Sequence, residues 1–432
     1  MRQEELGAYK GYFSTHYRVY HGVADLYTYF IEKGVSLLRP GGLFSYIVAN
    51  KWMRANYGEP LRQWFTTQRI EEIVDFGDLP VFKGATTYPC ILRIRKAPPE
   101  KTFRAATLDT LKFNDLSDYV NEKAYSISFN HLSAQAWTLV DDRARVLLEK
   151  IRNAGIPLGE YVGGKIYRGV LTGLNEAFVI DGETRDRLIT QDPKSDELIK
   201  PFLAGRDIKR YCIPQSDRYL ICIPNGWTRQ QTPTNHWSWL QKNYPAISEW
   251  LSAFSAPAQK RCDKGEFWWE LRTCDYYDAF EGPKIIIPAI TQSASYMFDK
   301  AGFYSNDKTT IIKMEDLYLL GVLNSKVPDY LMYTIASTKQ GGYYEYKPMY
   351  LVQLPIPVLD LSNKSNKDHH DHIALLADRM LTLNQQKVNA TTDHERTLLE
   401  RQITATDRQM DQLVYALYGL TEEEISIVEG KR

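Results

Sequence analysis

The 432 residues include 53 Lys and Arg and 53 Asp and Glu, so the formal net charge is zero, and 44% of the residues are hydrophobic. This balance is typical of a folded chain of two or three domains, and it excludes a histone-like protein that binds through bulk charge. The apolar runs are far shorter than the roughly 20 residues that a membrane helix needs, and the mixed-charge start excludes a secretory signal. We therefore expect a cytoplasmic protein without a membrane span.

The cysteines and aromatic residues indicate which ligands the chain could bind. Cys90, Cys212, Cys222, Cys262 and Cys274 are odd in number, and their spacings match no zinc-ligand pair, so we interpret them as reduced thiols. The chain also contains 29 Tyr and 9 Trp, whose side chains combine a stackable ring with a polar tip. Such residues suit contacts with bases or sugars.

The first 95 residues predict an α/β segment. Hydrophobic periodicity and turn residues indicate, in chain order, a helix over residues 22–38, a strand over 43–49, a helix over 57–68, and strands over 70–76 and 88–94. This order is typical of the trailing half of an α/β sheet. The strand over 43–49 is nearly continuously apolar, as buried strands are, yet these strands alone would leave it as an unprotected edge. We therefore expect a further part of the sheet ahead of it.

The rest of the chain predicts two more regions. A helix near residues 143–153 leads to a largely β region, in which short runs over 177–180, 219–223, 284–290 and 309–313 are separated by Gly, Pro and Asn. Beyond residue 360 a linker-like stretch over 362–371 precedes two antiparallel helices, over 373–387 and 395–418. Thr392 and Glu395 have capping-box spacing for the second of these helices, and Gly419 is a plausible stop for it.

Several motifs along the chain resemble those of a known family. Tyr29-Phe30-Ile31-Glu32-Lys33, Leu37-Leu38-Arg39-Pro40-Gly41-Gly42, and Val81-Phe82 before Pro89-Cys90-Ile91-Leu92-Arg93 resemble the region after the catalytic loop in TaqI-type N6-adenine DNA methyltransferases and fused type IIG restriction-modification enzymes. The segments around Gly169 to Phe178, Gly321 to Ser325, Gly341 to Tyr344 and Leu354 to Pro357 look like their target-recognition domain. Each motif is weak alone, but their order extends over some 400 residues.

The resemblance implies a fold class and a domain plan. We expect an α/β plus α+β chain, with a partial Rossmann-like methyltransferase sheet, a β-rich target-recognition domain and a C-terminal helical hairpin. The expected boundaries are residues 1–110, a connection over 111–155, the recognition domain over 156–360, and the helices over 361–432. In that family an Asn-Pro-Pro-Tyr loop contacts the amine of the target base, and a glycine-rich turn holds S-adenosylmethionine. Asn-Pro-Pro-Tyr and a Gly-x-Gly-x-x-Gly turn are absent from this sequence, so we expect this chain alone not to transfer a methyl group.

The resemblance also assigns roles to particular residues. Phe82 matches the ring that stacks on the flipped target adenine, and Phe30 matches a residue that packs on the adenine ring of S-adenosylmethionine, the cofactor of the complete enzyme. Asp25 and Tyr27, a turn earlier, are further candidates for that cofactor pocket. The alternatives are ordinary core positions: Phe82 closing a hairpin, and Phe30 on the inner face of an amphipathic helix.

A double-stranded DNA face is expected from basic and aromatic residues that lie near glycines. The candidates are Lys83, Lys165, Arg168, Thr172, Asn175, Lys260, Arg261, Arg272, Tyr343, Tyr344 and Lys347. The alternatives are a solvated charge run and a β-domain core. Of Trp268 and Trp269, we expect one side chain to be buried and the other to face DNA, because adjacent residues on a strand point to opposite faces.

Three further interpretations concern metals and partners. His369, His370 and His372 are assigned to the polar linker rather than to a metal site, since no Cys or acidic partner has ligand spacing. The missing amino-terminal methyltransferase half, on the same or a separate polypeptide, is the expected partner, with self-association through the exposed sheet edge as another outcome. The rival organisations are a fused nuclease-methylase and a stand-alone specificity subunit that docks partner chains through its C-terminal helices.

Overall fold

The computed structural model describes residues 3–84, 87–132, 134, 136–339 and 341–430. The chain divides into two units, the first comprising residues 1–150 with 331–345 and the second comprising residues 151–330 with 346–432. The domain boundaries expected from the sequence remain predictions. The grouping of residues 331–345 with the first unit was not anticipated, because nothing in a linear pattern indicates that a segment returns to a distant part of the fold.

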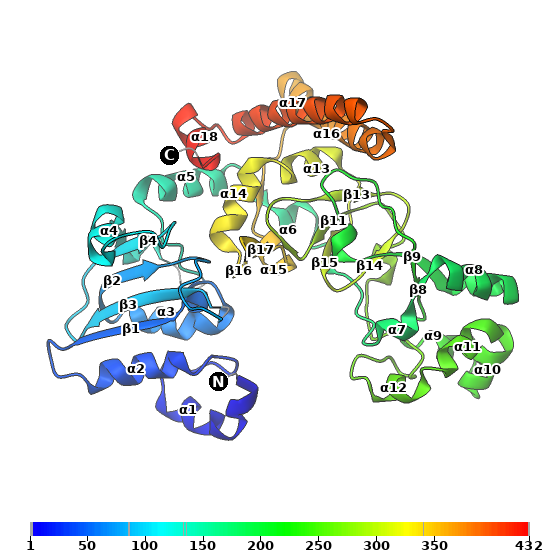
Figure 1. Cartoon of the computed structure of the whole chain (residues 1–432), viewed down its shortest axis with the longest axis horizontal. Helices are drawn as coiled ribbons and strands as arrows, with labels where there is room; N and C mark the ends of the chain where they lie inside the picture. Colours follow the sequence, from blue (N-terminus) through cyan, green and yellow to red (C-terminus); the bar gives the residue numbers. More distant parts are fainter. Residues whose placement is uncertain (1–2, 85–86, 133, 135, 340, 431–432) are drawn as a thin grey trace. The chain divides into compact units, whose positions relative to one another are not determined.

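The first unit is built on a five-stranded sheet of order β1-β3-β2-β4-β5 (Figure 1). β1 and β2 both pair antiparallel with β3, whereas β4 pairs parallel with β2. β1, β2 and β4 therefore run in one direction, and their carboxyl ends lie at the same edge of the sheet. The strands are β1 (Leu43–Ala49), β2 (Arg69–Asp75), β3 (Pro89–Arg95), β4 (Thr102–Thr107) and β5 (Tyr125–Ser128).

Strand β1 confirms the predicted bounds but not the predicted burial. Its exposure alternates, with Leu43 at 44% and Ile47 at 39%, while Val48 is buried. Helix α2 (Tyr27–Leu37) packs against only one face of this strand, so closely that a Cβ on Gly34 would lie 2.3 Å from the Phe44 ring. The expectation of a strand of the buried type was wrong, because Leu43 and Ile47 lie on the face of β1 away from Phe44 and are exposed. β3 is the one described strand that pairs with β1, so β1 lies at the edge of the described sheet.

The loop after β1 is held by a buried arginine. Helix α3 (Glu59–Phe65) follows a 3-10 turn at Asn56–Gly58 and is shorter than the predicted helix over 57–68. Arg62, on α3, is 1% exposed and donates to the carbonyl oxygens of Trp52, Ala55 and Ala134. These bonds satisfy a buried cation and fix the backbone that leaves the carboxyl end of β1.

The second unit contains two four-stranded sheets and more helix than predicted. Helices α8 (Gly182–Gln191), α10 (His236–Asn243) and α11 (Pro245–Ser252) are prominent among its additions. The predicted strand over 177–180 is half wrong, since Asn175–Phe178 forms helix α7 and the strand begins at Val179. The sheets have the orders β14-β9-β10-β8 and β13-β11-β15-β7, with β7 (Ile166–Arg168), β8 (Val179–Asp181), β9 (Ile199–Leu203), β10 (Arg218–Ile221), β11 (Lys284–Pro288), β13 (Met297–Asp299), β14 (Tyr304–Ser305) and β15 (Thr309–Ile312).

The C-terminal part is a pair of long helices, α16 (Lys364–Asn389) and α17 (Asp393–Leu417) (Figure 1). Thr392 and Glu395 form the predicted capping box, and Gly419 follows the helix with a φ of 62°, as its predicted role as a stop requires. The linker predicted over 362–371 was wrong, because α16 already begins at Lys364. Asn363 caps that helix by accepting from the amides of Ser365 and Asn366, so a polar segment becomes its first turns.

We expect the stability of the fold to depend on pH through a buried carboxyl on α17. The Asp411 side chain, on α17, is 6% exposed, and burial raises the pKa of its carboxyl from 3.8 to about 6, with repulsion from Asp407 opposed by Lys326 and Arg210. A raised folded-state pKa means that the protonated form stabilises the fold, fully below about pH 4, and that this stabilisation is lost as the pH rises through about 6. Asp411→Asn keeps an oxygen for the Lys326 amide that Asp411 now accepts.

We expect Asp411→Asn to raise the free energy of unfolding at about pH 8 by roughly 1–3 kcal/mol and to change it little at about pH 4. Urea titrations at the two pH values measure the difference. An equal effect at both would contradict the assignment of the shift to this carboxyl.

Candidate functional site

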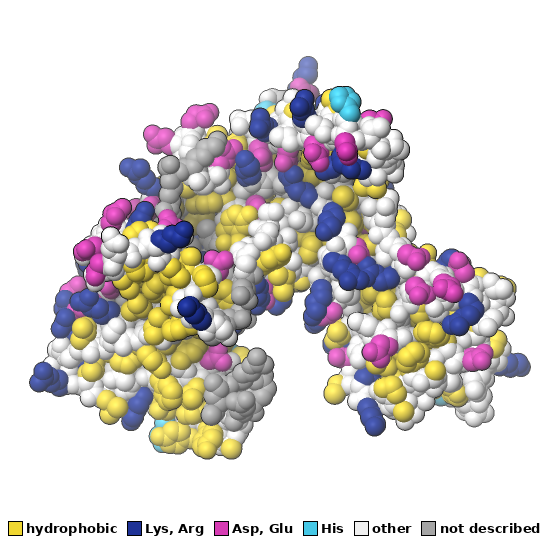
Figure 2. All heavy atoms as spheres, viewed as in Figure 1, with side chains coloured by type: hydrophobic (Ala, Val, Ile, Leu, Met, Phe, Trp, Pro, Cys, Tyr) yellow, Lys and Arg dark blue, Asp and Glu magenta, His cyan; other side chains and the backbone are white. Residues whose placement is uncertain are grey.

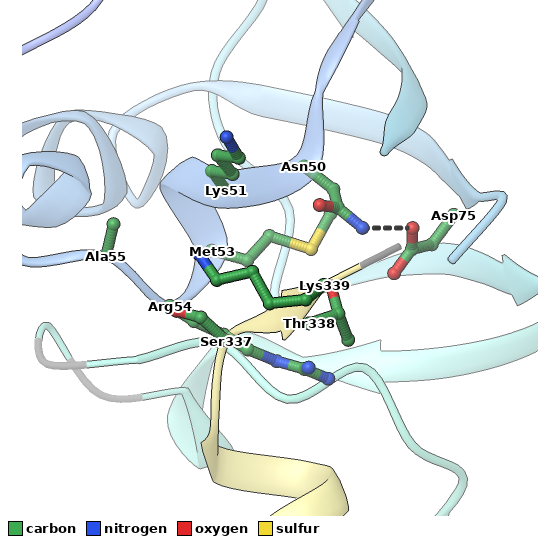
Figure 3. Close-up of a pocket in the computed structure, with 9 residues that line it drawn as sticks. All are labelled: Asn50, Lys51, Met53, Arg54, Ala55, Asp75, Ser337, Thr338 and Lys339. Atoms are coloured by element: carbon green, nitrogen blue, oxygen red, sulfur yellow. Dashed lines mark hydrogen bonds between the residues drawn. The ribbon is translucent and has the colours of Figure 1, made fainter. Parts of the chain in front are cut away.

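Polar side chains follow two parallel strands of the first unit at the point where each strand ends. Asn50 comes directly after β1, and Asp75 is the last residue of β2. Asn50 Nδ2 donates to Asp75 Oδ1 at 2.8 Å (Figure 3). The Gly77 amide donates to the same oxygen at 3.0 Å. The Asn50 amide donates to the Tyr88 carbonyl at 2.6 Å, which ties the end of β1 to the start of β3. In open α/β sheets ligands bind outside the carboxyl ends of the strands, so this edge is the candidate site.

Phe82 lies in the segment that leaves this edge. The chain passes from Asp75 at the end of β2 to β3 through a turn in which Gly84 has a φ of 79°. The Phe82 ring is 44% exposed, and Lys83 beside it is exposed. The alternative of a core phenylalanine that closes a hairpin is therefore excluded, and the ring is accessible to a ligand. Its stacking on a base stays a prediction.

The three cofactor candidates on and before α2 fall into two groups. Phe30 is 50% exposed, so it is not a core residue of the described structure. Tyr27 and Asp25 are joined through Tyr57, whose hydroxyl lies 3.1 Å from that of Tyr27 and donates to Asp25 Oδ2 at 3.4 Å. Burial raises the pKa of Tyr27 well above its usual value and that of Tyr57 to about 12, so both hydroxyls remain protonated. Phe30 is thus open to a ligand, whereas the Tyr27 hydroxyl is turned into the fold.

The second unit brings two predicted arginines to an aromatic pair. The Tyr167 and Tyr276 rings stack with centroids 4.5 Å apart. Burial raises the pKa of Tyr276, while Arg168 and Arg272 are both near enough to lower it. Arg168 pairs with Asp307 at 3.0 Å and Arg272 with Asp263 at 3.3 Å.

Basic side chains also gather over the sheet region of the second unit in Figure 2. Sequence reasoning missed Tyr167 and Tyr276. The alternation of Tyr167 with the neighbouring Ile166 and Arg168 would have indicated the first, but the pairing with Tyr276 is tertiary.

Two of the predicted DNA-contacting residues lie inside the second unit. Thr172 is 3% exposed, and its hydroxyl donates to Asn175 Oδ1 at 2.6 Å. Arg261 is 8% exposed, and its guanidinium donates to the carbonyl oxygens of Thr172, Trp268 and Glu270. Arg261 therefore holds the loop after Val170 to the tryptophan-rich loop. Neither side chain has a surface to offer a phosphate, so we correct these two assignments.

The other candidates are exposed or lie in the first unit. Lys165, Asn175, Lys260 and Lys347 are exposed on the second unit. In the first unit Tyr343 is 41% exposed, and Tyr344 is half-buried, with its ring centroid 4.7 Å from that of Tyr333.

Trp268 and Trp269 both pack against other side chains of the second unit. Trp269 is 5% exposed and donates through its ring nitrogen to Thr228 at 3.0 Å, and Trp268 is half-buried beside Trp237, with centroids 4.8 Å apart. Both belong to a turn rather than to a strand, so the expected alternation of faces does not apply.

His369, His370 and His372 lie on α16, not in a linker, and His370 stacks on Tyr318 with centroids 4.8 Å apart. The described residues contain no group of three or more His, Cys, Asp or Glu side chains arranged to hold a metal ion. No helix in the described part of the chain is long and apolar enough to cross a membrane.

The fold and this edge can now be placed among known proteins. Residues 1–82 match the family of the Eco57I restriction-modification methylase, and residues 200–356 match the TaqI-like C-terminal specificity domain. The resemblance drawn from the sequence is confirmed: a methylase segment of restriction-modification type is followed by a specificity-domain segment.

Particular relatives extend these matches over nearly the whole chain. The type II restriction enzyme and methyltransferase RM.Eco57I of Escherichia coli is 21% identical over 99% of this chain and 45% of its own length. The type II methyltransferase M.PaeR7I of Pseudomonas aeruginosa is 23% identical over 97% of this chain and 68% of its own length. The chain thus spans less than half of the first relative.

A solved structure shares the fold. The type IIL restriction-modification enzyme MmeI, solved in complex with DNA, matches with a TM-score of 0.57 and 13% identity, over 95% of this chain and 52% of its own. At this identity the likeness concerns the fold alone. It confirms the predicted fold class, a mixed α/β chain with small sheets and C-terminal helices.

Proposed function

We propose that this chain is the DNA-recognising portion of an S-adenosylmethionine-dependent N6-adenine DNA methyltransferase of a restriction-modification system, of the type IIG class. The observation that carries the proposal is the open Phe82 ring beside the carboxyl edge where Asn50 and Asp75 meet. An enzyme that modifies a base takes that base out of the stack and holds it by stacking and hydrogen bonds. An exposed aromatic ring at this edge provides the stacking surface.

The residues of this chain bind and orient in the proposed reaction. Phe82 stacks on the extruded adenine, and Lys83 beside it meets the DNA backbone. S-adenosylmethionine, when bound, supplies the methyl group. Phe30 fits the role of a ring against the cofactor's adenine, since half of its surface is open. Asp25 and Tyr27 would support that surface from within the fold, because both are joined to Tyr57 by hydrogen bonds.

The open edge of β1 supports the proposed partner. Its backbone pairs with β3 on one side, and Leu43 and Ile47 expose apolar surface beside it. Such an edge recruits another strand. We propose that a strand from a cofactor-binding amino-terminal half, on the same or another polypeptide, pairs here, and that self-association through this edge competes with it. We propose the cytoplasm as the site of action, because a DNA methyltransferase of a restriction-modification system meets its substrate there.

A map of modified adenines tests the function. Cells that express this chain together with the cofactor-binding half should carry N6-methyladenine at one recurring sequence, as detected by single-molecule sequencing. Cells that express the amino-terminal half alone should lack the pattern, because target recognition is assigned to this chain. Methylation on cytosine, or no methylation, would contradict the proposed function.

DNA binding by the second unit gives a separate prediction. Arg168→Ala and Lys347→Ala should each weaken duplex binding and make it less sensitive to salt, by about one counterion for each phosphate that the variant no longer neutralises. Fluorescence anisotropy across a salt series measures both quantities. Arg396→Ala is the matched control, since Arg396 is 49% exposed and paired with Asp393, much as Arg168 is 51% exposed and paired with Asp307. If all three variants bind duplex DNA alike, Arg168 and Lys347 do not belong to the DNA-binding surface.

The C-terminal helices favour one alternative. Leu375 and Val388 on α16 and Leu398 on α17 are 65%, 60% and 49% exposed. These aliphatic side chains suit the alternative of a stand-alone specificity subunit that docks partner chains through the helical pair. Affinity purification of a partner methyltransferase by this chain, abolished by Leu375→Asp, would favour it.

A further inference from the structure

A cavity opens at the carboxyl edge of the first unit, between the ends of β1 and β2 and a segment from far along the chain (Figure 3). Asn50, Lys51 and Arg54 line it from the loop after β1, and Asp75 lines it from the end of β2. The remaining wall includes Lys339, on strand β16 (Thr338–Lys339). All of these residues belong to the first unit, so the cavity lies within one unit of the structure.

The charges that line this cavity are predominantly positive. Asp75 is its one carboxylate, and Oδ1 of that carboxylate already accepts from Asn50 and Gly77. Lys339 pairs with Glu345 at 2.8 Å, and Arg54 donates through Nη1 to the Ala336 carbonyl at 3.0 Å, so that the guanidinium is held in place.

Lys51 is the cation that this arrangement leaves for a ligand. Its side chain is exposed, and within the described chain it has neither an ion pair nor a side-chain hydrogen bond. In Figure 3 its ammonium points away from Arg54 and Lys339, but the side chain is exposed and can turn toward an anion at the opening, where the Arg54 guanidinium is already held. Two such cations on one loop are suited to phosphate.

An aromatic side chain stands directly beside this opening. β16 pairs antiparallel with β17 (Tyr343–Glu345), and Lys339 is the register partner of Tyr343, whose ring is 41% exposed. Phe82 leaves the same sheet edge seven residues after Asp75. The cavity thus lies on an edge that carries open rings in two segments, a combination that follows a nucleic-acid strand, in which phosphates alternate with stackable bases.

We propose that this cavity holds a phosphodiester group of the DNA strand from which the target base is extruded, with Lys51 and Arg54 as the anchoring cations. The inference rests on the proposed function, because it places a phosphate next to the base that Phe82 receives. It goes beyond that function in assigning Lys51, Arg54 and the cavity, none of which the sequence reasoning singled out. Anchoring a phosphate at the edge of the sheet keeps the backbone in place while the base leaves the stack.

The test measures duplex binding by the full chain over a salt series, using a labelled DNA of fixed sequence. Lys51→Gln should bind more weakly than the unmodified chain at low salt, with a salt slope smaller by about one. Between about 50 and 200 mM salt, the unmodified chain should therefore lose roughly three- to fourfold more affinity than the variant. Lys51→Arg, which keeps the charge, should restore the slope.

Lys101→Gln is the matched control. Lys101 is an exposed lysine that immediately precedes β4, and because β4 is parallel to β2 it lies at the opposite edge of the same sheet. We expect Lys101→Gln to keep the full slope. The thermal unfolding of both glutamine variants should match that of the unmodified chain, since both lysines are exposed, so a loss of slope with unchanged unfolding assigns the effect to phosphate.

The outcomes separate this site from the function on which it rests. A salt slope for Lys51→Gln equal to that of the unmodified chain, while Arg168→Ala reduces it, overturns the cavity and leaves DNA recognition by the second unit in place. DNA binding that is absent or insensitive to salt in the unmodified chain overturns both. A reduced slope for Lys101→Gln as well as Lys51→Gln also overturns the cavity, because the effect would then be one of general charge.

Discussion

Phe82→Ala is expected to lower the proposed methyl transfer to adenine by roughly 10- to 100-fold when the chain is combined with the proposed cofactor-binding half. Stacking of a base on an aromatic side chain contributes about 1–3 kcal/mol by alanine substitution, and the 44% exposure of the Phe82 ring leaves it available for such stacking. Duplex affinity should change little, since the proposed phosphate and groove contacts are made by other side chains. Single-turnover transfer of a labelled methyl group, with duplex binding measured in parallel, checks both parts.

The conservative variant Phe82→Trp separates stacking from folding. A tryptophan ring supplies an equal or larger stacking surface, so Phe82→Trp should recover most of the rate, while Phe82→Leu, which restores bulk without a π face, should not. The Phe82→Ala variant should unfold like the unmodified chain, because the side chain is exposed. A full rate in Phe82→Ala would remove Phe82 from the site and with it the observation that carries the proposed function.

The second large effect is expected in the core of the second unit. Lys284 and Asp299 are both 0% exposed and form an ion pair at 2.5 Å between β11 and β13. Lys284 also donates to the Phe280 carbonyl at 2.6 Å, and Asp299 accepts from the amides of Ala301 and Phe303. Burial lowers the pKa of Lys284, with Asp299 opposing that shift.

Lys284→Ala removes the partner and leaves a buried carboxylate, which costs about 3–5 kcal/mol in buried pairs. We expect a loss of that size in the free energy of unfolding from urea titration of the full chain. Lys300→Ala is the control, since Lys300 and Glu315 pair at 2.7 Å but are 61% and 54% exposed, and surface pairs contribute about 0–1 kcal/mol. Similar losses in the two variants would contradict a buried, desolvated pair.

Some of the site followed from the sequence alone. The bounds of β1 were predicted to the residue, because an apolar run between Pro40-Gly41-Gly42 and a polar segment admits one strand. The capping box of α17 and its glycine stop were also predicted, since both depend on residues a few positions apart. Phe82 and Phe30 came from the family resemblance, and their exposure is what the structure added.

Other parts were decided by the tertiary structure. Arg261 is charged and lies in a basic, aromatic stretch, yet it is buried, because its guanidinium donates to three backbone carbonyl oxygens. Those carbonyls belong to Thr172, Trp268 and Glu270, the first of which is nearly 90 residues away in the sequence. The predicted linker became the start of α16 because Asn363 caps it, a local signal that the polar composition concealed.

The sequence by itself determined the local elements, the order of the methylase and specificity segments, and the residue types available for stacking and for phosphate. These depend on periodicity, capping and turn chemistry, which act over a few residues. Only the tertiary structure decided that Asn50 and Asp75 meet across β3, that Tyr167 stacks on Tyr276, and that β16 brings Lys339 to the sheet edge. Such contacts join residues tens to hundreds of positions apart, and they form because burying each element's apolar face selects one arrangement among many compatible with the same local pattern.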